Sequence, residues 1–519
     1  MNKRFEDLSL DEKIGQCLIF GFDALEVNDH AIEMIQKYKV GNVILFQRNV
    51  RDLHQLYELN QNLQKLALYH IGIPLFITID QEGGMVTRIK GDGPFFPGAM
   101  TITSSEKIDN AYFSGKYMGE FLKNLGINLN LAPTLDINNN PLNPVIGVRS
   151  FGDTPKKVVD FGIPYVRGLE ESIYACGKHF PGHGDTHTDS HLSLPVIHKT
   201  VKELKNFELI PFQKAIQEGI HSLMIAHINF PELTENGLPT SLSKNCITGL
   251  LREDMKYDGL VMTDCLEMKA IQKHYTTEKG FSMALLAGAD LGMVSHHQEL
   301  QIKAITYLKE SILAGTIDEA MVDQHVKRIL KYKQDLQVDL TTPFEKKEKA
   351  FYNKEVKSFN LSVVKSAFTL VKGECIHPSR STLVISSSPA ATTIADEAGG
   401  FQTIDDVVKG IGHPFESMVV SVALSKEEMK KVLRVSKEYE QIIFASYNPN
   451  QYPSQYHLME KLNEQGNLFV FTMRNPYDLH FLPKLKNVVE FYEYTPNSLE
   501  VFKEYLEGTI LPKDKGMVL

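Results

Sequence analysis

The chain has 519 residues, of which 43% are hydrophobic and 23% are charged. Because a single hydrophobic core stops growing at about 250–300 residues, this length indicates two domains of a globular protein. The 55 basic and 64 acidic side chains leave a net charge of −9, which argues against a nucleic-acid or anionic membrane partner and fits a neutral or cationic small ligand.

The cysteines and the first residues bear on the cellular compartment. Five cysteines occur without any CxxC spacing, mostly inside apolar runs, which is typical of free buried thiols in a reducing compartment. Residues 1–7 include two basic residues, but no apolar segment follows them, so we expect no signal peptide. No apolar run is long enough to cross a bilayer. We therefore expect a cytoplasmic protein without a membrane partner, and we expect it to be a monomer.

Short apolar runs, each closed by a polar or charged residue, recur along the first part of the chain. They cover residues 16–22, 42–46, 75–80, 128–133, 175–180, 222–228, 259–264 and 290–295. Amphipathic stretches that predict helices lie between them, among others at residues 52–69, 111–125, 155–171 and 201–218. Continuous apolar runs are typical of parallel strands covered by helices on both faces. The pattern predicts an α/β fold with a (β/α)8 TIM barrel.

Polar residues stand at or near the ends of five of these runs. They are Asp80, His179, His227, Asp264 and Ser295. Each alone is more often a helix N-cap or a solvated loop residue. In a (β/α)8 barrel, however, the C-terminal ends of the strands carry the active site, so the five together predict a site at that face.

The rest of the chain predicts a smaller α/β domain. Residues 302–335 look helical, and residues 337–353 are a polar, charged stretch that contains Pro343. Beyond them, predicted strands at residues 382–387, 418–422, 441–445 and 467–472 alternate with predicted helices at residues 426–439 and 455–464. This order is typical of an open parallel sheet with helices on both faces. We predict a catalytic barrel over residues 1–340, a linker over 341–360 and an αβα sandwich over 361–519.

The densest polar cluster is residues 178–191, which hold four histidines and two aspartates directly after a predicted strand. A core segment cannot carry this composition, and a plain surface loop does not need it. Two functions compete. The cluster could bind zinc or manganese through alternating histidine and aspartate, or one histidine could transfer protons beside a carboxylate, as Asp189 could position His191. The metal set would be His183, Asp185, His187 and His191. Spacing alone leaves both open.

Three further segments carry candidate site residues. Residues 259–264 form an apolar strand that ends in Asp264, which could also be a helix cap. Residues 80–88 place two glycines beside acidic residues and end in Arg88, so this loop could approach a ligand closely. Residues 145–152 place Arg149 between glycines. For either arginine alone, a surface salt bridge is the commoner explanation.

Residues 178–191 resemble the signature loop of the β-N-acetylglucosaminidases of glycoside hydrolase family 3, KHFPGHG followed by D-[ST]-H. The resemblance extends over nearly the whole chain, through residues 10–16, 80–88, 130–136, 149–152 and 259–264, and through residues 474–478 and 494–496, which are similar to the second domain of Gram-positive members. Two departures stand out. Cys265 follows Asp264 where many members have a second aspartate, and the chain ends in Gly516-Met517-Val518-Leu519 instead of the Gly-x-Leu-Pro-Val ending of many two-domain members.

The resemblance implies roles for the matching residues. Asp264 would be the nucleophile, His191 the acid/base and Asp189 the partner of His191. The sugar in the cleaved subsite would be held by Asp80, Arg88, Arg149, Lys178 and His179. The resemblance implies neither a metal nor a cofactor, so His183 and His187 would be structural loop residues.

The implied reaction is that of a retaining glycosidase whose second carboxyl is replaced by imidazole. Asp264 would form a covalent glycosyl-enzyme, and His191 would protonate the leaving oxygen and then deprotonate water. The implied substrates are N-acetylglucosamine glycosides, above all peptidoglycan fragments in cell-wall recycling. Two alternatives stay open. A neutral imidazole does not repel an anionic nucleophile, so phosphate could replace water and make the enzyme a β-N-acetylglucosaminide phosphorylase, and the histidine-rich loop could serve a metal-dependent hydrolase.

Overall fold

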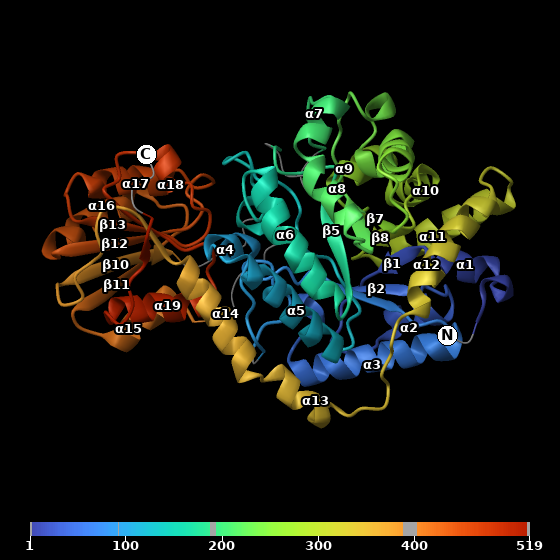
Figure 1. Ribbon diagram of the computed structural model, residues 1–519, viewed down its shortest axis with the longest axis horizontal. Helices are drawn as coiled ribbons and strands as arrows, with labels where there is room; N and C mark the ends of the chain where they lie inside the picture. The colour runs from blue at the N-terminus through green and yellow to red at the C-terminus, as the bar shows by residue number, and fades with distance from the viewer. Residues whose placement is uncertain (1–2, 92, 187–193, 388–401, 516–519) are drawn as a thin grey trace.

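The barrel is the centre of the first two-thirds of the chain. The computed structural model describes residues 3–91, 93–186, 194–387 and 402–515 (Figure 1). Within these residues, eight parallel strands pair in chain order, and β1 closes the barrel on β8. They are β1 (Leu18–Phe20), β2 (Asn42–Leu45), β3 (Phe76–Ile79), β4 (Leu129–Asn130), β5 (Tyr174–Phe180), β6 (Ser222–Ile225), β7 (Leu260–Cys265) and β8 (Leu291–Val294). The predicted barrel and its eight strands are confirmed.

Helices surround the barrel, and several of them begin at a side-chain cap. The carboxylate of Asp52 accepts the Gln55 N–H at the start of α3, and the hydroxyl of Thr154 accepts the Lys157 N–H at the start of α6. The barrel-side helices are α1 (Leu10–Gln16), α2 (Asp29–Gln36), α3 (Leu53–His70), α4 (Ala99–Ser104), α5 (Ile108–Asn124), α6 (Pro155–Glu170), α7 (Val201–Asn206), α8 (Leu209–Gln217), α9 (Lys269–Tyr275), α10 (Thr277–Ala287), α11 (Gln298–Leu313) and α12 (Glu319–Gln334).

Helices α5 and α6 approach each other unusually closely, because glycines face each other across their contact. A Cβ atom on Gly115 would lie 2.1 Å from the Tyr165 carbonyl oxygen, and one on Gly168 would lie 2.1 Å from the Tyr112 carbonyl oxygen. Real Cβ atoms are not found at such distances from an oxygen, so this helix pair requires both glycines.

Two of the predicted helices are each broken into two. The segment 201–218 forms α7 and α8, because Pro211 has no N–H to donate to the carbonyl of Phe207, where the helix stops. The segment 302–335 belongs to α11 and α12, which are separated at Gly315 with φ of 73° and restarted by the N-cap Asp318.

The second domain is built on one mixed sheet with the strand order β11-β10-β12-β13-β14-β9-β15. The first five strands in this order are parallel, and β9 is antiparallel to β14. The strands are β9 (Thr369–Lys372), β10 (Thr382–Ser387), β11 (Phe415–Val420), β12 (Gln441–Ser446), β13 (Leu468–Thr472), β14 (Asn487–Glu490) and β15 (Lys513–Asp514). The helices are α15 (Ile404–Ile411), α16 (Lys426–Val435), α17 (Ser454–Asn463), α18 (Asp478–Phe481) and α19 (Pro496–Leu506). The predicted open-sheet domain is confirmed, with an antiparallel strand that the sequence did not predict.

The predicted linker is largely helical. It contains α13 (Phe344–Phe351) and the first half of α14 (Lys354–Ala367), which leads into the second domain (Figure 1). Phe351 and Val363 pack in the core of the barrel side, whereas the neighbouring Val364 packs in the core of the second domain. The domain boundaries at residues 340 and 360 stay a prediction. Among the described helices, none combines the length and the apolar character that a membrane crossing requires.

Candidate active site

A cavity of about 950 Å³ opens at the C-terminal ends of the barrel strands, where parallel barrels carry their active sites. It brings together the six predicted site residues that the structure describes. They are Asp80, Arg88, Arg149, Lys178, His179 and Asp264. The two others, His191 and Asp189, lie outside the described residues.

Asp264 is the second-last residue of β7 and is part-exposed to this cavity. Its Oδ1 accepts the N–H of Cys265 at 2.7 Å. Cys265 is buried, and burial raises the pKa of its thiol to about 12, so this residue stays a neutral neighbour. The carbonyl oxygen of Cys265 is 3.0 Å from Nε2 of His227, which lies two residues beyond the end of β6. The strand end that presents Asp264 is therefore held from the side.

Buried charges form a chain along one wall of the cavity. Nζ of Lys178 lies 2.6 Å from Oδ1 of Asp80 and 2.7 Å from Oε1 of Glu82. Arg149 makes a two-point contact with Glu82, through Nη2 at 2.7 Å and Nε at 3.0 Å. Arg88 lies 3.6 Å from the other oxygen of Asp80. Two carboxylates thus face three cations, which suits a site for a ligand rich in hydroxyl oxygens.

Glu82 was not predicted as a site residue. Burial alone would raise the pKa of Glu82, but the Arg149 guanidinium and the Lys178 ammonium hold that pKa well below its usual range. Burial alone would lower the pKa of Lys178, but the carboxylates of Asp80 and Glu82 raise that pKa above its usual value. The sequence carried no separate signal for Glu82, because the need for a second acid follows from the burial of Arg88, Arg149 and Lys178 beside Asp80, which only the structure shows.

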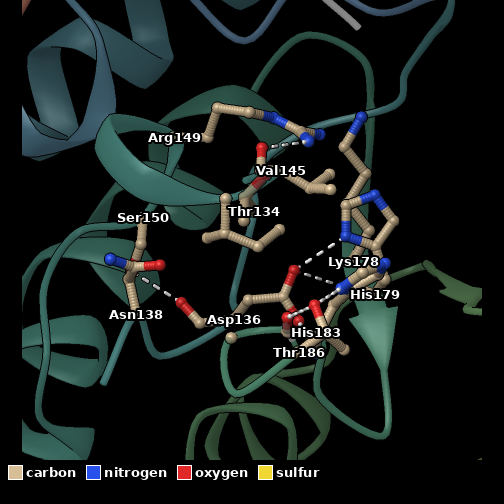
Figure 2. Close-up of polar contacts among 12 residues, drawn as sticks. Thr134, Asp136, Asn138, Val145, Arg149, Ser150, Lys178, His179, His183 and Thr186 are labelled. Carbon is tan, nitrogen blue, oxygen red and sulfur yellow. Dashed lines mark hydrogen bonds and ion pairs between the residues drawn. The ribbon is translucent and has the colours of Figure 1, made fainter. Parts of the chain in front are cut away.

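Asp136, which follows β4, contacts His179 and His183, the two histidines of the signature loop that the structure describes (Figure 2). Asp136 Oδ2 is 2.7 Å from Nδ1 of His179, and its Oδ1 accepts the backbone N–H of His183 at 2.6 Å. Burial, with the nearby His179, lowers the pKa of His183 to about 4, so this imidazole is neutral at physiological pH. The resemblance had pointed to Asp136, but no role had been predicted for it.

The described half of the alternative metal set has separate partners. Nδ1 of His183 lies 2.9 Å from Oγ1 of Thr186, and Asp185 pairs with Lys199 at 2.6 Å. In the part of the chain that the structure describes, no group of three or more histidine, cysteine, aspartate or glutamate residues is placed to hold a metal ion. His187 and His191 lie outside that part.

Comparison with known families explains this cavity. The model described as "Glycosyl hydrolase family 3 N terminal domain" matches residues 9–332, which is more than half of the chain. The chain belongs to glycosyl hydrolase family 3. The match ends within α12, so it includes the whole barrel and every described residue of the cavity named above.

Relatives within the family carry hexosaminidase names. Beta-hexosaminidase A of Pseudoalteromonas piscicida is 33% identical over 327 residues, which are 59% of this chain and 55% of that protein. The beta-hexosaminidase of Thiobacillus denitrificans is 32% identical over 276 residues, which are 52% of this chain and 75% of that protein. The chain thus matches little more than half of the first of these relatives.

A solved structure matches both domains. The glycoside hydrolase family 3 beta-N-acetylglucosaminidase from Paenibacillus sp. str. FPU-7 has a TM-score of 0.91 and 37% sequence identity to this chain. The match covers 97% of this chain and 98% of that one. The barrel and the second sheet therefore occur together in that protein of the same family.

Proposed function

We propose that this protein is a retaining β-N-acetylglucosaminidase that releases N-acetylglucosamine from β-glycosides. The observation that carries the proposal is that Asp264 shares one cavity with five residues that can bind a sugar. The names of the relatives and of the solved structure support the choice of sugar.

In the proposed mechanism, Asp264 attacks the anomeric carbon while the glycosidic bond breaks through an oxocarbenium-like transition state. His191 gives its proton to the leaving oxygen, so the aglycone departs as an alcohol. A water molecule then attacks the glycosyl-enzyme, His191 takes the water's proton, and the bond to Asp264 breaks. Asp189 orients the imidazole and stabilises its charged form.

The remaining cavity residues hold the sugar in this proposal. Asp80 accepts hydrogen bonds from hydroxyl groups, and Arg88, Arg149, Lys178 and His179 donate them. Glu82 is added to this set as a positioning residue, because it contacts Arg149 and Lys178 at once. A charged donor with a fixed position gives stronger and more specific hydrogen bonds than a free one.

The proposed substrates are peptidoglycan fragments, and the proposed setting is cell-wall recycling in the cytoplasm. All five cysteines are free, and four of them are buried, which fits a reducing compartment. The incoming nucleophile is proposed to be water, and phosphate is the alternative.

The test is turnover of a β-linked N-acetylglucosamine disaccharide by the wild type and by Asp264→Gly, with and without phosphate. We expect the wild type to release free N-acetylglucosamine under both conditions. The variant should lose at least about 10⁴-fold in kcat, since the covalent step is removed, and should still bind the sugar. Azide should restore activity to the variant and give an azide product of inverted anomeric configuration.

If Asp264→Gly without azide keeps a kcat within about tenfold of the wild type, Asp264 is not the nucleophile. Formation of N-acetylglucosamine 1-phosphate as the main product would replace hydrolysis by phosphorolysis. Asp153→Gly is a matched control, since Asp153 is an exposed acid that pairs with Lys157 across a helix start.

A further inference from the structure

Some of the contacts between the second domain and the barrel lie at a loop that carries a proposed sugar ligand. The segment between β4 and Arg149 is held by hydrogen bonds to the second domain at four points. They join Asn138 to Tyr477, Pro141 to Asn450, Pro144 to Gln451 and Val148 to Asn475. In each pair, the first residue belongs to the barrel side and the second to the second domain.

Asn475 packs directly against the backbone of the turn before Arg149. Its side-chain oxygen accepts the N–H of Val148 at 3.1 Å, and a Cβ atom on Gly147 would lie 2.3 Å from the same oxygen. Gly147 has φ of 48°, so the turn needs glycine both for its backbone conformation and for the approach of Asn475. The N–H of Gly147 donates to Asn138, whose amide in turn donates to Tyr477. The N–H of Val148 thus bonds the second domain directly, and the N–H of Gly147 is linked to it through Asn138.

This turn presents Arg149 to the cavity. The guanidinium is held by Glu82 through two N–H groups. A third N–H group donates to the Val145 carbonyl oxygen at 3.2 Å (Figure 2). With these contacts made, the backbone of the turn and the side chain of Glu82 together set the position of the guanidinium. A shift of the turn therefore moves the arginine or breaks its pairing.

The same segment supports the start of the signature loop. Asn143 donates to the carbonyl oxygens of His183 at 2.8 Å and Gly184 at 2.9 Å, and its own oxygen accepts the N–H of Val145 at 2.8 Å. Asn143 lies between Pro141 and Pro144, whose carbonyl oxygens accept hydrogen bonds from the second domain.

A second, separate anchor holds the glycine-rich loop between Asp80 and Arg88. The buried Glu493 accepts the Gly98 N–H at 2.8 Å and the Thr101 hydroxyl at 2.7 Å. Gly84 packs on this segment, since its Cβ atom would lie 2.8 Å from Cα of Gly98. Next to Glu493, the backbone N–H of Tyr494 lies 3.1 Å from the sulfur of Met85.

We propose that the second domain positions the sugar subsite, and that Asn475 is the positioning residue for Arg149. Asn475 does not touch the sugar in this proposal. It acts through the turn, as a buried acceptor with a fixed place. The inference rests on the proposed role of Arg149 as a sugar ligand.

The test compares Asn475→Ala, Asn475→Asp and Asn497→Ala by kcat, KM, the inhibition constant Ki of N-acetylglucosamine and the unfolding temperature. We expect Asn475→Ala to raise KM and Ki together by about tenfold with kcat within about twofold, because sugar contacts are lost before and during reaction alike. Asn475→Asp keeps an acceptor for Val148 and should stay within about threefold of the wild type.

Asn497→Ala is the matched control. Asn497 donates its amide to the Phe95 carbonyl at 2.9 Å across the same interface. Phe95 lies outside the two segments, residues 80–88 and 145–149, that carry the proposed sugar ligands on this side. The constants of Asn497→Ala should stay within about twofold of the wild type. A folded Asn475→Ala with wild-type KM and Ki overturns the inference, as does an equal effect of Asn497→Ala. If Asn475→Ala does not fold, Asn475→Ser carries the same test, because its shorter side chain stays polar but does not reach Val148.

Arg149→Lys tests the sugar-binding role of Arg149 separately from the role of the second domain. If it leaves the Ki of N-acetylglucosamine unchanged, Arg149 is no sugar ligand, and both its proposed role and the present inference fail. If it raises Ki while Asn475→Ala does not, the proposed function stands and only the role of the second domain is overturned.

Discussion

Glu82 is the acid on which two buried cations of the cavity depend, and its replacement should be costly. Glu82→Gln leaves Arg149 and Lys178 without their shared carboxylate, which costs about 3–5 kcal/mol of folding stability when one partner of a buried pair is removed. Thermal unfolding at neutral pH should show this loss. Glu171→Gln, which removes an exposed partner of Lys116, should change the unfolding temperature little.

The difference in stability between the wild type and Glu82→Gln should depend on pH. The pKa of Glu82 is lowered on folding, so its stabilising effect is complete above the unfolded value, near 4.5, and is lost as the pH falls from there toward the folded value. The gap in unfolding temperature between the wild type and Glu82→Gln should therefore narrow below about pH 4.5. A gap that stays constant down to pH 3 would contradict the assigned pairing.

Residues at strand ends could be predicted, and residues that act through others could not. Asp80 and Asp264 each close an apolar run, so the pattern itself marks them. Glu82 and Asp136 lie in irregular segments, where their role depends on partners far away in the sequence. His191 and Asp189 were named from the signature loop, and their placement remains a prediction.

At the scale of elements, the contact between α5 and α6 sets a limit on substitution. Gly168→Ala puts a methyl group against the Tyr112 carbonyl, and such overpacking costs about 1–3 kcal/mol, more than the helix gains from alanine. Gly410→Ala in α15 is the control, because a Cβ atom there meets nothing within 4 Å. We expect the unfolding temperature to fall for Gly168→Ala and to rise slightly for Gly410→Ala. A rise in both would show that α5 and α6 can move apart freely.

The strands of the barrel were predictable because burial on both faces makes them continuously apolar. Strands β9 and β14 were missed, since each has four residues with polar or charged ends and gives no run that stands out. The helix breaks at Phe207 and Gly315 were also missed, although Pro211 and Gly315 were readable signals. Amphipathic periodicity continues across a break, so it alone did not reveal them.

For the whole molecule, the proposed chemistry uses only side chains of the chain. We expect activity to be unchanged after dialysis against excess chelator, and added zinc to have no activating effect. A loss of activity that zinc restores would favour the metal-dependent alternative built on the histidine-rich loop. Glycosidase activity of a zinc-independent relative, measured in the same buffers, serves as the control for chelator effects on the assay.

The two-domain organisation could be predicted from length and from the change in pattern near residue 340. The way in which the domains meet could not, because their contacts join single residues that are hundreds of positions apart in the sequence. Asn475 and Val148, for example, are 327 residues apart. The sequence around either residue has no pattern from which this contact could be predicted.

This separation has a consequence for biosynthesis. All eight barrel strands and Asp264 leave the ribosome before Asn475 is made. At roughly 5–20 residues per second, translation leaves roughly 15–65 s between Val148 and its partner. A chain that stops before residue 475 contains every residue proposed to contact the sugar but lacks the contact that holds the turn before Arg149. The sugar site is thus completed last, although its residues are synthesised first.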